Sequence, residues 1–266
     1  MAGKDLEGFV VVVTGASSGL GRAIAEGAAE RGAEAVVVNY ASNRAEAEET
    51  GRRVEALGAK AVTVQGDVAS DDDCRRIVAA AAPWGRIDAL FNNAGQTVFA
   101  NHADMGAVSA EDFQRIYAVN VVGPFQMVRA ARALLEAAQL PGAVVNTSSI
   151  AGVTGIGSSV PYAASKGALV TMTLSLARAL APKIRVNVIC PGYIDTPWFG
   201  RGMPEAAVER LRANAAASTP LQAASKPEDI AGAALFFASP AARHITGETL
   251  LVDAGSHLGR ASLAMR

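Results

Sequence analysis

Short apolar segments rich in β-branched residues alternate with alanine-rich segments along almost the whole chain. Runs that are apolar throughout are typical of strands buried on both faces, which occur in parallel sheets covered by helices. The alternation therefore predicts an α/β fold: one doubly wound parallel sheet of about seven strands with helices on both faces. The expected strands are Phe9–Val13, Ala35–Val38, Ala61–Val64, Ala89–Asn92, Val144–Thr147, Ile184–Ile189 and Thr249–Val252.

The chain length favours a single domain over residues 1–266. Its 266 residues, 50% of them hydrophobic, suffice for one large core, and no repeat or interdomain linker is evident. The least regular stretch is Tyr193–Lys226, which is long for a loop between core elements. We therefore expect a substrate loop or lid at about residues 193–226, holding short helices.

Charge and cysteine content narrow the possible partners. The formal net charge is −1, from 24 basic and 25 acidic residues, so neither nucleic acid nor an anionic membrane is an expected partner. Cys74 and Cys190 form no paired motif, and no acidic or histidine cluster has metal-ligand spacing. The apolar run Val10–Val13 is too short for a signal segment or a membrane span, which favours a cytoplasmic location.

A glycine-rich turn follows the first expected strand and opens a helix, in the order Thr14-Gly15-Ala16-Ser17-Ser18-Gly19-Leu20-Gly21. Glycines there allow a tight turn and a close approach of the backbone to a pyrophosphate, and the helix amino terminus adds free N–H groups. The strand–turn–helix context favours a dinucleotide site over a plain turn. The residues expected to hold the dinucleotide are Gly15, Ser17, Ser18, Gly19, Leu20 and Gly21.

The same turn also fits the G-x-S-x-G nucleophile elbow of serine hydrolases, with Ser17 as the nucleophile. Only His102, His244 and His257 could complete such a triad. The hydrolase fold usually builds several strands before its elbow, whereas this turn follows the first strand, so we rank the hydrolase well below the dinucleotide site.

Tyr162 and Lys166 stand four residues apart, which places them one turn apart on the same face of a helix. A close ammonium favours the phenolate and lowers the pKa of a tyrosine from its ordinary value near ~10. Such a phenol can give a proton to a carbonyl oxygen or take one from an alcohol. The alternative is a buried ring beside a solvated charge.

Several motifs occur in one order at sensible spacings: the glycine-rich turn, Asn92-Asn93-Ala94-Gly95, Asn120, Ser149, Tyr162-x-x-x-Lys166 and Pro191-Gly192. Together they resemble the short-chain dehydrogenase/reductase family, and most of all its 3-oxoacyl carrier-protein reductase-like members. The resemblance covers Phe9 to Gly255. It implies a Rossmann-type sheet in the order 3-2-1-4-5-6-7 and an NAD(P)(H)-dependent oxidoreductase that interconverts a ketone and a secondary alcohol.

The resemblance also assigns catalytic roles. It implies that Tyr162 is the acid/base, and that Lys166 lowers its pKa and bonds the nicotinamide ribose. Ser149 would bind the substrate oxygen, with Ser148 as a competing candidate. Asn120 would hold a water chain leading to Lys166, although a helix-interior amide capping a local backbone group is the alternative.

Cofactor choice depends on the end of the second strand, where an acid binds the ribose of NAD. Here Asn39 or Tyr40 takes that place, and neither is negative. Ser17, Ser18, Asn39 and Ser42 could donate hydrogen bonds to a 2′-phosphate. Arg44 could add a positive charge, or lie solvated at the next helix start. We therefore expect NADP(H) to be preferred, with NAD(H) possible.

The resemblance implies further cofactor contacts after later strands. Asp67 and Val68 would meet the adenine, although Asp67 could cap a helix instead. Asn93 would tie strands together beside the adenosine ribose. The nicotinamide would meet the segment after the sixth strand. The remaining contacts implied are Ala94, Gly95, Tyr162, Lys166, Pro191, Gly192, Ile194 and Thr196.

The expected substrate wall is mainly apolar and comprises Gln96, Val98, Phe99, Val153 to Ile156, Tyr193, Trp198 and Phe199. It favours a small-molecule substrate, a ketone or secondary alcohol with apolar bulk, although some of these residues could be lid core. A 3-oxoacyl thioester reductase is the second candidate, and a nucleotide-binding relative without catalysis is a third. The resemblance implies a homotetramer that assembles through two alanine-rich helices, Phe113–Ala138 and Pro161–Ala181.

Overall fold

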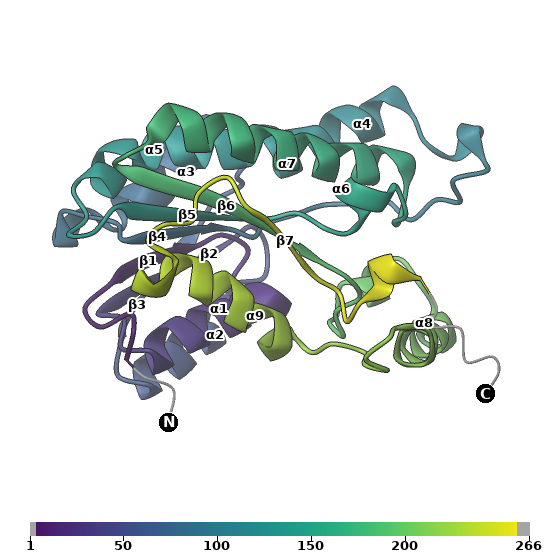
Figure 1. Cartoon of the computed structure of the whole chain (residues 1–266), viewed down its shortest axis with the longest axis horizontal. Helices are drawn as coiled ribbons and strands as arrows, with labels where there is room; N and C mark the ends of the chain where they lie inside the picture. The colour runs from purple at the N-terminus through teal and green to yellow at the C-terminus, as the bar shows by residue number, and fades with distance from the viewer. Residues whose placement is uncertain (1–3, 260–266) are drawn as a thin grey trace.

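The computed structural model describes residues 4–259, in which seven parallel strands form one sheet with helices on both faces (Figure 1). The strand order is β3-β2-β1-β4-β5-β6-β7, which confirms the predicted Rossmann-type sheet. The strands are β1 (Val10–Val13), β2 (Ala35–Tyr40), β3 (Lys60–Gln65), β4 (Ala89–Asn92), β5 (Gly142–Thr147), β6 (Ile184–Pro191) and β7 (Thr249–Val252).

Two helical layers enclose the sheet (Figure 1). One layer holds α1 (Gly19–Glu30), α2 (Arg44–Ala56) and α9 (Pro227–Ala238). The other holds α3 (Asp71–Ala79), α4 (Ala110–Tyr117), α5 (Gly123–Glu136) and α7 (Val160–Leu180). Two helices, α6 (Ala151–Thr154) and α8 (Glu205–Ser218), lie at the carboxyl ends of the strands. Within residues 4–259 no helix is long and apolar enough to cross a membrane.

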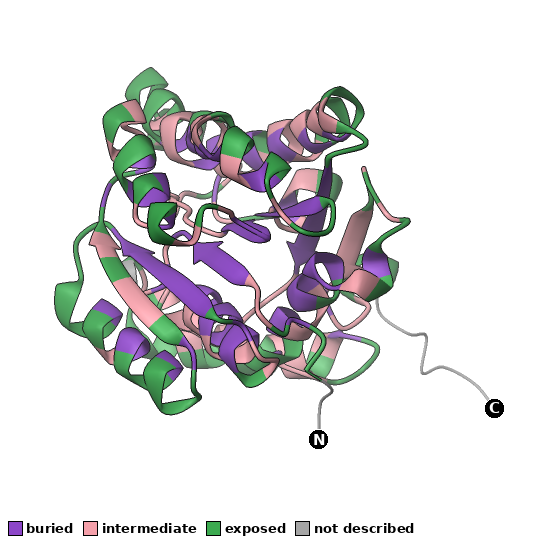
Figure 2. Cartoon of the chain, turned by 90° about the vertical axis from the view of Figure 1, so that its left-hand side faces the viewer, coloured by how far each residue is buried: buried purple, intermediate pink, exposed green. Residues whose placement is uncertain are grey.

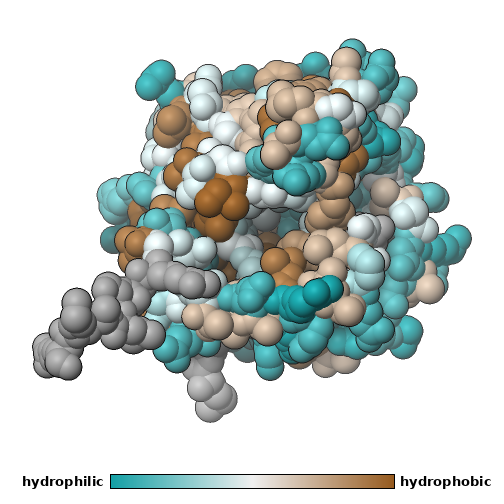
Figure 3. Space-filling model, turned by 90° about the vertical axis from the view of Figure 1, so that its right-hand side faces the viewer, coloured by the Kyte–Doolittle hydropathy of each residue, from teal (hydrophilic) through white to brown (hydrophobic). Residues whose placement is uncertain are grey.

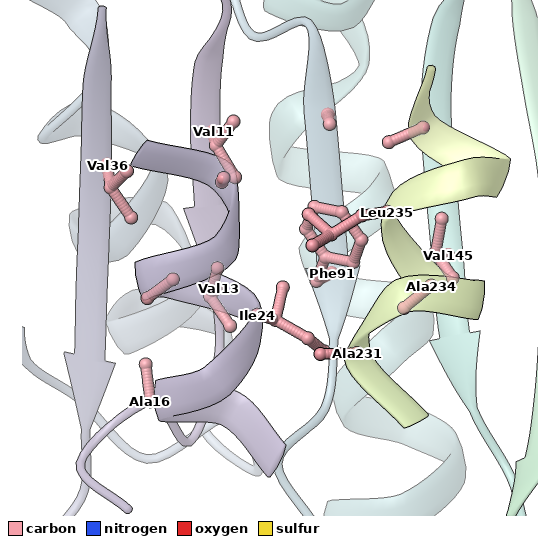
Figure 4. Packing of buried hydrophobic residues seen from close by; sticks show 14 of the residues in the cluster. Val11, Val13, Ala16, Ile24, Val36, Phe91, Val145, Ala231, Ala234 and Leu235 are labelled. Atoms are coloured by element: carbon pink, nitrogen blue, oxygen red, sulfur yellow. The ribbon is translucent and has the colours of Figure 1, made fainter. Parts of the chain in front are cut away.

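Strand β1 shows how the sheet generates two cores. Successive side chains of a strand point to opposite faces. Val11 and Val13 therefore join Ile24 and Leu235 beneath α1 and α9 (Figure 4), whereas Val10 and Val12 join the cluster beneath α3 and α5. The central strands are buried throughout (Figure 2).

Two expectations need correction. The edge strands β3 and β7 are only partly buried, because each has a neighbour on one side only. The helix expected over Phe113–Ala138 is α4 and α5 joined by a π-helical segment, Ala118–Val122, which contains Asn120. The irregular stretch 193–226 contains a 3₁₀ turn, Phe199–Arg201, and α8, in agreement with a loop that holds helices.

Candidate active site

The glycine-rich turn joins β1 to α1 and packs against the end of β4. Gly15 has a positive φ of 63°, and a Cβ on it would lie 2.9 Å from Ala94 Cα. A Cβ on Gly21 would lie 2.4 Å from the Gly15 carbonyl oxygen. Thr14 Oγ1 accepts hydrogen bonds from the N–H groups of Asn93 and Ala94, both at 3.0 Å. The turn is thus a backbone cradle without room for further side-chain atoms.

Two side-chain amides brace this cradle, one from the half-buried Asn93 and one from the buried Asn39. Asn93 Nδ2 donates to the carbonyls of Thr14 (3.1 Å) and Gly15 (3.3 Å), so Asn93 ties two strand ends together as expected. Asn39 Oδ1 accepts from Gly15 N at 3.2 Å, and Asn39 Nδ2 donates to the Gly66 carbonyl at 3.0 Å. Asn39 is 1% exposed. This corrects the expectation that Asn39 donates to a 2′-phosphate, because its side-chain amide is already hydrogen-bonded to backbone groups in the interior.

Sequence reasoning missed Arg22, which anchors the turn from outside. Its guanidinium donates to the Ser17 carbonyl at 2.6 Å and to Thr50 Oγ1 at 2.9 Å, and it pairs with the Glu46 carboxylate. These bonds join the turn to α2. In the sequence, the signal for this role was a basic residue directly after Gly21, the last glycine of the turn.

The β2–α2 connection carries the remaining expected 2′-phosphate contacts. Tyr40 is buried, whereas Ser42 and Arg44 are exposed. Arg44 Nε donates to Glu48 Oε1 at 2.7 Å, and the Arg44 side chain is 78% exposed. This geometry matches the alternative of a solvated arginine at a helix start. Ser17 and Ser18 lie half-buried at the turn.

At the end of β3, Asp67 is exposed and its Oδ1 accepts from Ala69 N at 2.9 Å. Ser70, not Asp67, caps α3. Val68 packs against Gly123, and its carbonyl accepts from Gln126 Nε2 at 3.0 Å. The hydrogen bonds of Asp67 and Val68 do not identify either residue as an adenine contact.

Tyr162 and Lys166 face the end of β5 from the first turns of α7. Lys166 is 3% exposed, and its Nζ donates to the Thr147 carbonyl at 2.8 Å and lies 5.6 Å from the centre of the Tyr162 ring. A Cβ on Gly95 would lie 3.7 Å from Lys166 Nζ and 3.6 Å from Asn120 Oδ1. The fold therefore brings Gly95 and Asn120, which are far away in the sequence, next to Lys166.

The two titratable groups shift in ways that the sequence argument did not foresee. Burial raises the pKa of Tyr162 to about 12, and a hydrogen bond from Ser149 opposes this rise. Burial lowers the pKa of Lys166 to about 8. Loss of solvation is the largest cause of the raised Tyr162 pKa, so the lowering of this pKa by Lys166 stays a prediction.

The two candidate serines have different surroundings. Ser148 is buried, and its hydroxyl donates to the Lys166 carbonyl at 2.8 Å. Ser149 is half-buried, its Oγ accepts from Ala151 N at 3.1 Å, and it bonds the Tyr162 phenol. Ser149 is therefore the serine beside the tyrosine oxygen, whereas Ser148 holds the α7 backbone.

Asn120 is fully buried, and both the oxygen and the nitrogen of its side-chain amide form hydrogen bonds. Its Oδ1 accepts from Gln96 N at 2.8 Å, and its Nδ2 donates to the Gln96 carbonyl at 3.0 Å and to Ser165 Oγ at 2.9 Å. The backbone group that this side chain satisfies is 24 residues away in the sequence, so it is not the local backbone group of the alternative. Ser165, which sequence reasoning missed, also donates to the Tyr162 carbonyl at 2.7 Å.

The expected substrate wall is built largely from rings. Phe199 stacks on Tyr193 with centroids 5.2 Å apart and is tilted against Phe99 at 6.1 Å. Trp198 is tilted against Tyr162 at 6.4 Å. Val153 and Ile156, from the same expected wall, are exposed. Hydrophobic side chains border a hollow on this face (Figure 3).

The segment after β6 faces the glycine turn. Ile194 forms a bridge with Ser225, and Thr196 Cγ2 would lie 3.2 Å from a Cβ on Gly19. The cradle, the helix amino terminus and Lys166 Nζ supply the backbone donors, close approach and cation that a dinucleotide requires, so the residues fit this cofactor. In residues 4–259 no group of three or more His, Cys, Asp or Glu could hold a metal ion.

The hydrolase alternative lacks its histidine. His257 pairs with Asp253 at 2.9 Å, and His102 bonds the Gly157 carbonyl at 3.0 Å. Over the described range 4–259, no hydrogen bond joins Ser17 to a histidine.

Comparisons with known proteins agree with this geometry. Residues 15–257 match the family model adh_short_C2, described as enoyl-(acyl carrier protein) reductase. A Streptomyces violaceoruber protein named as ketoacyl reductase 2 of the granaticin polyketide synthase is 40% identical over 97% of this chain and 100% of its own. An L-rhamnose 1-dehydrogenase (NAD(P)(+)) of a Sphingomonas strain is 37% identical over 96% of this chain and 98% of its own.

A solved structure supports the same assignment. A short-chain dehydrogenase/reductase from Burkholderia xenovorans superposes with a TM-score of 0.85 at 39% identity, covering 94% of this chain and 98% of its own. The chain belongs to the short-chain dehydrogenase/reductase family and is an NAD(P)-dependent oxidoreductase that interconverts a ketone and a secondary alcohol.

Proposed function

We propose that Tyr162, Lys166, Ser149 and Asn120 are the catalytic residues of an NADP(H)-preferring carbonyl reductase. The observation that carries this proposal is the convergence of three groups: Lys166 Nζ lies beside Gly95 and 5.6 Å from the centre of the Tyr162 ring, and Ser149 bonds the Tyr162 phenol. Tyr162 and Lys166 come from α7 and Ser149 from the segment after β5, and hydrogen bonds to neighbouring backbone groups hold Lys166 Nζ and Ser149 Oγ.

A bound nicotinamide would supply the hydride in reduction and accept it in oxidation. The Ser149 hydroxyl donates to the substrate oxygen and holds it next to the Tyr162 phenol. A raised pKa keeps Tyr162 protonated at neutral pH, so it is ready to give its proton to that oxygen in the direction of reduction. The Lys166 ammonium then stabilises the phenolate, and Asn120 fixes the Gln96 backbone beside it.

Replacing Tyr162 with phenylalanine tests the proposed acid. Tyr162→Phe removes only the hydroxyl, so NADPH should still bind while kcat falls by about 10²–10⁴. Tyr117→Phe, on α4, is the matched control and should keep most of its activity. Near-normal turnover of Tyr162→Phe would contradict the assignment.

The NADP(H) preference is supported by the absence of an acidic residue from Asn39 to Ala45, between the end of β2 and the first turn of α2. Ser17, Ser18 and Ser42 remain available donors, and the exposed Arg44 can leave Glu48 for a phosphate. The kcat/KM for NADPH should exceed that for NADH, and Arg44→Ala should lower their ratio about tenfold. Arg52→Ala, exposed on the same helix, is the control. A ratio below one in the unmodified protein would refute the preference.

The ring-lined wall supports a ketone or secondary alcohol with apolar bulk as the substrate. The similarity to a protein named as a ketoacyl reductase favours a 3-oxoacyl thioester as the second candidate. A panel of aryl and alkyl ketones, acetoacetyl thioesters and sugars, followed by NADPH absorbance, separates them. Higher kcat/KM for sugars than for all apolar ketones would contradict both.

A homotetramer and a cytoplasmic location remain predictions. Exposed apolar side chains on α4, α5, α7 and the π segment between them support association of this layer with other copies: Phe113, Val122, Phe125 and Leu174. Light scattering should give the mass of four chains, and a monomer would contradict the prediction.

A further inference from the structure

Glu46 carries the first carboxylate after the end of β2, because no acidic residue stands from Asn39 to Ala45. It lies in the first turn of α2, and its side chain is 48% exposed. Glu46 and Ser18 line the same cleft beside the glycine turn. An unpaired carboxylate in this place would repel the 2′-phosphate of NADP(H), because like charges a few ångströms apart oppose each other.

Arg22 holds this carboxylate from α1. Arg22 Nη2 lies 2.5 Å from Glu46 Oε2 and 2.6 Å from the Ser17 carbonyl oxygen. These two oxygens are therefore separated by no more than the sum of the two distances, which places the carboxylate next to the turn. Arg22 also donates to Thr50 Oγ1 at 2.9 Å and to the Glu46 carbonyl at 3.2 Å. The guanidinium is thus fixed by acceptors from both α2 and the turn.

The ion pair of Arg22 and Glu46 is nearly neutral for a ligand beside it, because the two opposite charges largely cancel. Loss of either partner would leave one full charge beside Ser17. Arg44 and Glu48 form a second pair on the same helix, but their side chains are 78% and 50% exposed, so solvent and salt screen them strongly. The Arg22 side chain is 18% exposed. The first pair is therefore the one whose balance a ligand at the turn would sense.

We propose that Arg22 and Glu46 are a specificity-determining pair for the cofactor. Arg22 cancels the Glu46 carboxylate beside the 2′-phosphate, and Glu46 limits how strongly the protein prefers NADP(H) to NAD(H). This role rests on the proposed function, in which Ser17 and Ser18 donate to the 2′-phosphate. The 2′-hydroxyl of NAD(H) carries no charge, so only the affinity for NADP(H) responds strongly to the balance between the two side chains.

Glu46→Gln tests the pair with the smallest change in shape. It removes the negative charge and leaves Arg22 in place. The Kd for NAD⁺ divided by the Kd for NADP⁺, from equilibrium dialysis at low salt, should rise about three- to tenfold, mainly through tighter binding of NADP⁺. Glu55→Gln makes the same charge change at the exposed far end of α2 and should leave the ratio unchanged. An unchanged or lower ratio in Glu46→Gln would overturn the proposal.

Arg22→Gln provides the opposite test, because it leaves the carboxylate unpaired. The same ratio should fall about three- to tenfold, and damage to the turn that weakens both cofactors equally does not change a ratio. Adding Glu46→Gln to Arg22→Gln should raise the ratio again by at least about threefold.

A double variant with a ratio as low as that of Arg22→Gln would show that Arg22 acts only through the turn, and would overturn the pair while leaving the proposed function intact. Glu46→Gln decides the proposal even where Arg22→Gln does not fold. A ratio below one in the unmodified protein would contradict the NADP(H) preference but not the pair, which the response to Glu46→Gln still decides. No binding of either cofactor by the unmodified protein would contradict the proposed function, and the pair with it.

Discussion

The glycine turn and the segment 193–226, which is the proposed lid, form the two proposed walls of one site, but they are held in different ways. Around the turn, backbone atoms are fixed by Thr14, Asn39 and Asn93, and a methyl group on Gly21 has no space. Around the lid, Phe199 rests on other rings, and α8 has no buried residue.

The difference shows how such a fold separates cofactor binding from substrate binding. A wall made of buried backbone binds one ligand shape and tolerates few changes, because a shift at one atom displaces the others. A wall made of partly exposed rings can change residue by residue without loss of the core. We therefore expect substitutions at the turn to cost stability and cofactor affinity, and substitutions in the lid to alter substrate affinity.

The largest effect should come from Gly21→Ala. Its Cβ would overlap the Gly15 carbonyl, so the turn must shift. Overpacking of this kind costs about 1–3 kcal/mol of unfolding free energy. Displacement of the cradle should raise the Kd for NADPH on the order of 10²-fold. Urea unfolding and equilibrium dialysis measure the two changes.

Gly200→Ala is the matched lid variant, because a Cβ there meets nothing within 4 Å. Gly200→Ala should change neither the free energy of unfolding nor the Kd for NADPH appreciably. Equal losses in both variants would remove the proposed distinction between the two walls.

An intermediate effect concerns Lys166, which lies between the walls. Its pKa is lowered to about 8 from 10.5, so the unfolded state binds more protons between those values. Its contribution to the free energy of unfolding is therefore present above pH 10.5 and is lost as the pH falls through about 8. Urea midpoints at several pH values should rise over this window in the unmodified protein, and less steeply in Lys166→Met. The same slope in both proteins would show that Lys166 is not desolvated.

The smallest effect should come from Phe199→Ala. Losing its ring contacts with Tyr193 and Phe99 should raise KM for an apolar ketone about three- to tenfold, with kcat and the Kd for NADPH nearly unchanged. Phe236→Ala, which removes a comparable ring pair on α9, is the control. A larger loss in NADPH affinity than in KM would place Phe199 on the cofactor side.

Much of the fold could be predicted from the sequence, because buried parallel strands leave continuous apolar runs. All seven expected strands are present, with end points that differ by a few residues. The edge strands differ most, since their exposure depends on which neighbours cover them. The π segment at Asn120 was missed because its alanine and valine neighbours also fit an ordinary helix.

Within the proposed site, the motifs predicted candidate residues but not the direction of each side chain. Asn39 was expected to face a 2′-phosphate and instead holds the Gly15 N–H from inside. Arg44 pairs outward with Glu48, while the unpredicted Arg22 anchors the turn. Such outcomes depend on hydrogen-bond partners contributed by other elements, which spacing along the chain does not specify.

By itself the sequence determined the strand–helix alternation, the glycine turn and the Tyr162/Lys166 spacing, because these follow from local periodicity and residue chemistry. Only the tertiary structure decided the environment of each group. Burial raises the pKa of Tyr162 and lowers that of Lys166, and the lid places Trp198 beside Gly95. Solvation and steric access are properties of the packed molecule, since they arise from atoms that meet only after the chain has folded.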